Sequence, residues 1–111
     1  MNAEELKHKL KEIFGSQIIF NKEFDSHADT IKNIDRTLIE WCNLLKDGKI
    51  RAIRPPKLAE SVIFIKKIGS SNRCIVVKIV NGEFKEIHLG DHAYYDKLRK
   101  LLGLEKDTKY H

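Results

Sequence analysis

Five side chains able to hold or transfer a proton lie close together near the C-terminal end of the chain: His88, Asp91, His92, Tyr94 and Tyr95. Histidine and tyrosine can act as general acids or bases. RNA is cut by its own 2′-hydroxyl when that group loses a proton and the departing 5′-oxygen gains one. Such a reaction needs cations to stabilise charge on the phosphate, but neither a metal nor a nucleophilic cysteine. The cluster is therefore a candidate for chemistry on an RNA backbone.

Basic residues that could hold the phosphate lie on and before the same part of the chain. The chain has 21 Lys and Arg residues against 16 Asp and Glu, a formal net charge of +5, which modestly favours a polyanionic partner. Arg suits bidentate contacts with phosphate. Each of these cations could equally be a solvated surface charge. The candidates for contact with phosphate are Arg51, Arg54, Lys57, Lys66, Lys67, Arg73, Lys78 and Lys85.

Each member of the proton-transferring cluster also has a structural interpretation. Asp91 has the type and position of a helix N-cap, and one of Tyr94 and Tyr95 starts the apolar stripe of that helix. His88 is expected on the apolar side of a strand and His92 on the surface. A zinc site would need four well-spaced ligands, which these residues do not supply. We expect no metal and no cofactor.

Hydrophobic periodicity predicts the elements that position these residues. An Asn81-Gly82 pair between two apolar runs is typical of a β-hairpin turn. The expected fold is α+β, with helices packed on one face of an antiparallel sheet of about four strands. We expect one domain over residues 1–111, with a helical extension at 1–15 and a mobile tail at 104–111. Helices are predicted at 2–14, 22–33, 35–47 and 92–102, and strands at 17–20, 51–54, 61–68, 73–80 and 83–89.

A two-residue hairpin loop predicts the register of the last two strands. It sets Lys78 opposite Lys85 and Val76 opposite Ile87, with His88 on the other face. Like charges directly across a ladder are destabilising, so the lysine pair favours a face that meets an anion. The alternative is that both lysines extend into water. We expect Lys66, Arg73, Lys78, His92 and one of Tyr94 and Tyr95 to converge on one concave, basic surface.

The segment from Lys66 to Arg73, the hairpin turn after it and the run Gly90-Asp-His92-x-x-Tyr95 resemble the RelE/ParE superfamily of toxins from type II toxin–antitoxin systems. The resemblance covers about residues 16–102. It implies a RelE-like interferase that cuts messenger RNA on the ribosome, with Lys66 and Arg73 holding the phosphate and His92 and Tyr95 completing the catalytic set. Helices on both faces of residues 61–89, or a parallel sheet, would overturn the family assignment and most of what rests on it.

The same resemblance implies a cognate antitoxin protein as partner, and the cysteine usage favours a cytoplasmic location. Two alternatives stay open: a non-catalytic toxin of the same fold, such as a gyrase inhibitor, and a basic nucleic-acid-binding domain. Cys42 and Cys74 lie in apolar runs without CxxC spacing, which predicts buried, reduced thiols. No apolar run has the length of a membrane span, about 20 residues.

Overall fold

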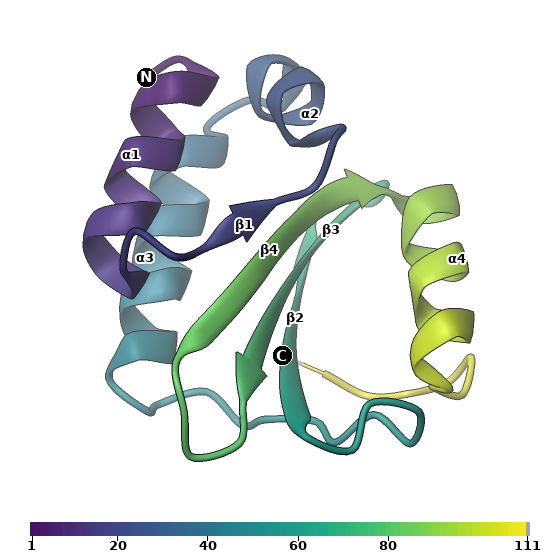
Figure 1. Ribbon diagram of the computed structural model, residues 1–111. Coiled ribbons are helices and arrows are strands. Elements are labelled where there is room, and N and C mark those ends of the chain that lie inside the picture. Colours follow the sequence, from purple (N-terminus) through teal and green to yellow (C-terminus); the bar gives the residue numbers. More distant parts are fainter. Residues whose placement is uncertain (111) are drawn as a thin grey trace.

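The computed structural model describes residues 1–110, which form four helices and one four-stranded sheet (Figure 1). The predicted α+β class is confirmed. The predicted strand at 51–54 is reduced to a single bridge between Ile53 and Ile63. The elements are α1 (Ala3–Phe14), β1 (Ile19–Phe20), α2 (Phe24–Thr30), α3 (Ile34–Lys46), β2 (Ser61–Ile68), β3 (Asn72–Ile79), β4 (Phe84–Asp91) and α4 (His92–Leu102).

The sheet has the strand order β1-β4-β3-β2 and is mixed. Strands β2, β3 and β4 form the predicted antiparallel meander, but β1 runs parallel to β4. The prediction of a wholly antiparallel sheet is therefore wrong at its first strand. Directly after β1, the side-chain amide of Asn21 donates to the carbonyl of Leu89 (3.0 Å) while its oxygen accepts from the Leu89 N–H (2.9 Å), which ties this end of β1 to β4.

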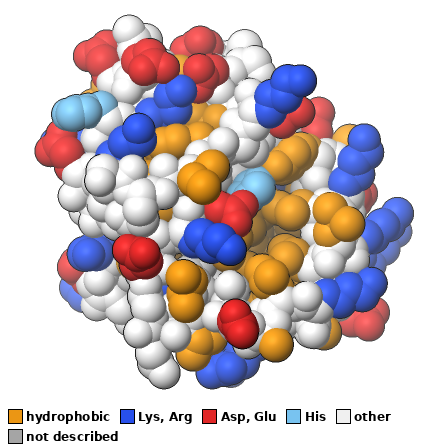
Figure 2. Space-filling model, viewed as in Figure 1, with side chains coloured by type: hydrophobic (Ala, Val, Ile, Leu, Met, Phe, Trp, Pro, Cys, Tyr) orange, Lys and Arg blue, Asp and Glu red, His pale blue; other side chains and the backbone are white. Residues whose placement is uncertain are grey.

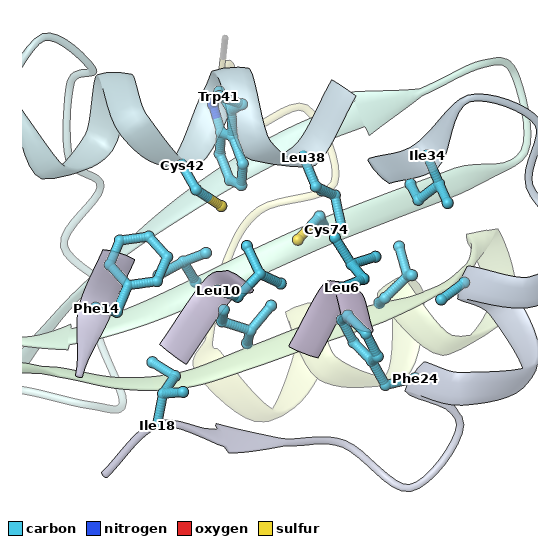
Figure 3. Packing of buried hydrophobic residues seen from close by; sticks show 14 of the residues in the cluster. Leu6, Leu10, Phe14, Ile18, Phe24, Ile34, Leu38, Trp41, Cys42 and Cys74 are labelled. Carbon is cyan, nitrogen blue, oxygen red and sulfur yellow. The ribbon is translucent and has the colours of Figure 1, made fainter. Parts of the chain in front are cut away.

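One face of the sheet is covered by α1, α2 and α3. Figure 3 shows Leu6 and Leu10 of α1 and Leu38 of α3 packed with Cys74 of β3 in this core. Leu6 and Leu10 are fully buried. The predicted N-terminal extension is thus part of the main core, because its apolar stripe covers the sheet beside α3.

The opposite face is covered by α4, whereas the helix pair predicted over residues 22–47 packs on one face as expected. The expectation that the helices lie on one face of the sheet is therefore wrong for α4. Leu102 and Tyr95 pack there against Ile65, Ile75 and Val77. The cause lies in β3, where Cys74 to Val77 are all buried. Side chains alternate between the faces of a strand, so an unbroken apolar run needs cover on both sides.

The segment after α4 returns over the same face. Leu104 is buried in the core beneath α4, and the ring of Tyr110 lies 6.1 Å from the ring of Tyr95. Residues 104–110 therefore lie along this face of the sheet through the contacts of Leu104 and Tyr110, and the mobility of the tail stays a prediction. Residue 111 lies outside the described residues.

The predicted register of β3 and β4 holds only away from the hairpin loop. Val76 lies opposite Ile87 as expected, but a bulge after Val77 sets Lys78 opposite Phe84. The loop has three residues, since the Ile79 N–H donates to the carbonyl of Glu83 (3.0 Å). The predicted pairing of Lys78 with Lys85 is therefore wrong. The ammonium of Lys78 instead lies 5.8 Å from the ring centre of Phe84.

Candidate functional site

Arg73, Tyr95 and His92 come together where β3 begins and α4 starts. The central carbon of the Arg73 guanidinium lies 5.6 Å from the centre of the Tyr95 ring, within the range of a cation–π contact. The centre of the His92 ring lies 6.4 Å from the same ring. Three of the four predicted catalytic residues therefore lie together, with Arg73 and His92 both beside the Tyr95 ring. We call Arg73, Tyr95 and His92 the tyrosine-centred cluster.

Arg73 is held firmly within this cluster and is only 8% exposed. Its Nε donates to the Tyr110 hydroxyl (2.7 Å), and its Nη1 donates to the carbonyl of Asn72 (2.9 Å). Among residues 1–110 these two atoms make the hydrogen bonds of the guanidinium, which leaves Nη2 for an anion. Burial and the neighbouring Tyr110 raise the pKa of Tyr95, and Arg73 opposes them by favouring the phenolate.

His92 is the exposed member of the cluster, with 62% of its side chain accessible. It occupies the first position of α4, directly after Asp91. The carboxylate of Asp91 accepts a hydrogen bond from the Tyr94 N–H (2.9 Å), so the prediction that Asp91 caps the helix is confirmed. One turn along α4, a carboxylate oxygen of Asp96 lies 3.4 Å from His92 Nε2. This arrangement orients an imidazole that stays open to solvent and to a substrate.

Lys66, the fourth predicted catalytic residue, does not share a face with Arg73. Lys66 lies opposite Cys74, which faces α3, whereas Lys67 lies opposite Arg73 itself. The two lysines nevertheless meet at the sheet edge, because β2 is the outer strand. There they line a recess of about 470 Å³ together with Thr108, Lys109 and Tyr110.

This recess makes the β2 edge basic. An adjoining recess of about 420 Å³ is lined by Arg51 and also by Lys109 and Tyr110. Two of the predicted RNA-binding residues, Arg51 and Lys67, thus lie beside the tyrosine-centred cluster. Lys109 and Tyr110 were missed by sequence reasoning, which expected no fixed structure in their segment. The sequence feature that could have indicated an ordered segment there is Leu104, an apolar residue directly after Gly103, where the helix ends.

The other predicted RNA-binding residues lie elsewhere. Lys78 is near the far end of β3, and Lys85 is exposed beside the bulge in β4. Lys57 lies against Gly103 at the end of α4, and Arg54 is exposed in the connection before β2. The expected single concave surface that includes Lys78 is therefore not formed.

A second acid–base group lies on β4 beside the cluster. His88 Nε2 is 2.9 Å from a carboxylate oxygen of Glu86, and His88 Nδ1 is 2.7 Å from the Tyr94 hydroxyl. If Nε2–H donates to Glu86, then Nδ1 accepts the proton of the phenol. Burial, and the negative charges of Glu23 and Glu86, raise the pKa of Tyr94. Sequence reasoning named His88 and Tyr94 only as supporting residues and missed Glu86, although a spacing of two sets it on the face of His88.

Figure 2 looks onto this side of the molecule, where apolar side chains gather between the sheet and α4. Comparisons of the chain with models of protein families, with curated proteins and with solved structures found no match. Within residues 1–110, no helix is long and apolar enough to cross a membrane. In the same part of the chain, no three side chains of His, Cys, Asp or Glu come together as a metal site requires.

Proposed function

We propose that this protein is a RelE-like toxin that cuts messenger RNA on the ribosome without a metal, and that the tyrosine-centred cluster is its reaction centre. The observation that supports this most is the position of Tyr95, whose ring lies against both the Arg73 guanidinium and the His92 imidazole. It joins a fixed positive charge to an exposed imidazole, a group that can act as a general acid or base.

The proposed reaction is attack of a 2′-hydroxyl on the neighbouring phosphate. His92 takes the proton of the 2′-hydroxyl, a bond forms between the 2′-oxygen and phosphorus, and the bond from phosphorus to the 5′-oxygen breaks. The 5′-oxygen leaves with a proton from water or from a tyrosine hydroxyl of the site. Arg73 Nη2 stabilises the negative charge on the phosphate oxygens. The products are a 2′,3′-cyclic phosphate and a 5′-hydroxyl.

Lys66, Lys67 and Lys109 at the β2 edge would hold the RNA backbone on the approach to Arg73. These contacts carry no base specificity and depend strongly on salt. The small surface offers little that fixes the geometry of the attacking hydroxyl, which the ribosome would supply. In this proposal the partners are ribosome-bound messenger RNA and an antitoxin protein, and the site of action is the cytoplasm.

The fold departs from the expected family pattern in two respects. Helix α4 covers the face opposite to α2 and α3, and β1 is parallel to β4. Helices on both faces count against the RelE/ParE resemblance. The proposal therefore depends on the chemistry of the cluster more than on the resemblance.

The test is expression of the chain without an antitoxin, followed by primer extension on ribosome-bound message. We expect growth arrest and new 5′ ends. His92→Ala should lower the cleavage rate about 10²–10⁴-fold if His92 transfers the proton. His8→Ala is the matched control, since His8 is an exposed histidine on α1. Equal cleavage by both variants would exclude His92 as the base.

A non-catalytic, basic nucleic-acid-binding domain is the second candidate. The burial of Arg73 and Tyr95 favours it, because little of either side chain is exposed to a substrate. In that case RNA binds in a salt-dependent manner and is recovered uncut. Growth arrest with intact message and altered DNA supercoiling would instead point to gyrase.

A further inference from the structure

The outer surface of α4 carries an exposed apolar side chain among lysines. Leu101 is 72% exposed. It lies beside Lys97 and Lys100 of the same helix, and with Lys57 these residues line a recess of about 590 Å³. Figure 2 shows basic side chains gathered over α4. We call these four residues the Leu101 surface.

The Leu101 surface is preformed by two segments that are distant in sequence. The Lys57 N–H donates to the carbonyl of Leu102 (3.1 Å), which ties the turn before β2 to the end of α4. Gly103 ends the helix with φ +77°, and a Cβ there would lie 2.9 Å from Cγ of Lys57. The stem of Lys57 therefore lies directly against the helix end. A ligand would meet a surface that is already ordered, which lowers the entropic cost of binding.

The charge of the Leu101 surface has one sign. Its three ammonium groups have no carboxylate within 4.0 Å in the part of the chain that the structure describes. The residues that line the recess include neither an acidic nor an aromatic side chain. The complementary ligand is thus anionic, and its apolar part packs on an aliphatic side chain.

These features favour a protein over a nucleic acid. A phosphate backbone would satisfy the lysines but would leave Leu101 without an apolar contact. Bases that stack need aromatic or guanidinium planes, which the recess lacks. An acidic segment with an apolar anchor would contact both the lysines and Leu101, since protein interfaces combine an apolar centre with a polar rim.

We propose that the Leu101 surface docks an acidic protein segment that inserts an apolar side chain between Lys57, Lys97 and Lys100. The segment's carboxylates pair with the three ammonium groups. This surface lies on the solvent side of α4, whereas Tyr95 points inward to the tyrosine-centred cluster. The proposal does not depend on RNA cleavage.

The test measures binding of a labelled peptide of glutamate and leucine, with leucines at helical i, i+3, i+4 and i+7 spacing, to the whole chain by fluorescence anisotropy. Leu101→Ala should weaken binding about tenfold, and Lys97→Glu with Lys100→Glu should weaken it further. Leu44→Ala is the matched control, because Leu44 is an exposed leucine on α3. It should leave the affinity unchanged.

Several results would overturn the proposal. One is that Leu101→Ala and the unsubstituted chain bind the peptide with equal affinity. A second is that the unsubstituted chain binds a peptide whose leucines are replaced by serine as tightly as the original peptide. Another is a Leu101-dependent association with single-stranded RNA, with phosphatidylserine vesicles or with a second copy of the chain, while the peptide does not bind. Leu101→Gln, which keeps a good helix former, guards against loss of α4. Leu101→Gln should lower the affinity for the peptide by as much as Leu101→Ala does.

Discussion

The phenol of Tyr94 bonds His88 Nδ1 at 2.7 Å while its ring covers Gly90. The two contacts join the end of β4 to the first turn of α4. A Cβ at Gly90 would lie 2.5 Å from a carbon of the Tyr94 ring, so glycine is required there by close approach alone. The Tyr94 side chain therefore helps to fix the orientation of α4 relative to β4, and with it the positions of His92 and Tyr95.

Gly90→Ala should destabilise the fold by about 1–3 kcal/mol, because the added methyl group overpacks the contact with Tyr94. Urea unfolding measures the change. Tyr94→Ala removes the ring, so in that background Gly90→Ala should cost much less. Additive effects of the two substitutions would mean that the clash is not with Tyr94.

The raised pKa values of Tyr94 and Tyr95 predict loss of stability in alkaline solution. A raised pKa means that the folded state holds the phenol proton more tightly than the unfolded state does. The free energy of unfolding should therefore be independent of these groups below pH 10.0, the ordinary tyrosine pKa, and should fall as the pH rises through the raised values. Urea unfolding at several pH values measures this. The fall should be smaller in Tyr94→Phe, and an equal fall would exclude Tyr94 as a source.

The two cysteines should be inert to thiol reagents in the folded protein. Cys42 and Cys74 are buried in the core between α3 and the sheet, where Figure 3 shows both side chains. Burial raises the pKa of both thiols, which suppresses the reactive thiolate. Labelling by iodoacetamide should follow global unfolding in urea. Rapid labelling without denaturant would show that this core opens locally.

The sequence predicted the elements well where their signals are local. The helix predicted from residue 2 begins there, with a capping box of Asn2 and Glu5, and Asp91 begins α4 as expected. The errors concern long-range choices. Whether α4 packs beside α3 or on the other face depends on the cover required by both sides of β3, which helical periodicity alone does not reveal. A bulge also shifted Lys78 out of its predicted pair, since a change of one residue alters every partner beyond it.

The candidate site was predicted in part for the same reason. Arg73, His92 and Tyr95 are close to the predicted hairpin and helix start, so a correct local structure brings them together. The prediction for Lys66 depended on which face of β2 its side chain takes. In the structure the neighbouring Lys67, and not Lys66, lies opposite Arg73. Tyr110 was missed, because its contact with Arg73 spans 37 residues of sequence and requires the return of the chain after α4, of which Leu104 was the one local sign.

Tyr110→Phe should reveal whether the last segment restrains Arg73. The substitution removes the hydroxyl that accepts the 2.7 Å hydrogen bond from Arg73 Nε and keeps the ring that packs on Tyr95. Loss of this charged hydrogen bond should lower the free energy of unfolding by about 1.5–3 kcal/mol. With Nε freed, affinity for a short single-stranded RNA should rise at low salt, because Arg73 gains a second donor for phosphate. Arg73→Lys is the control, since it keeps the charge without the fork of donors. If Tyr110→Phe binds RNA as the unsubstituted chain does, the freed Arg73 Nε makes no contact with RNA, and the phosphate is held by Nη2 or by the lysines at the β2 edge.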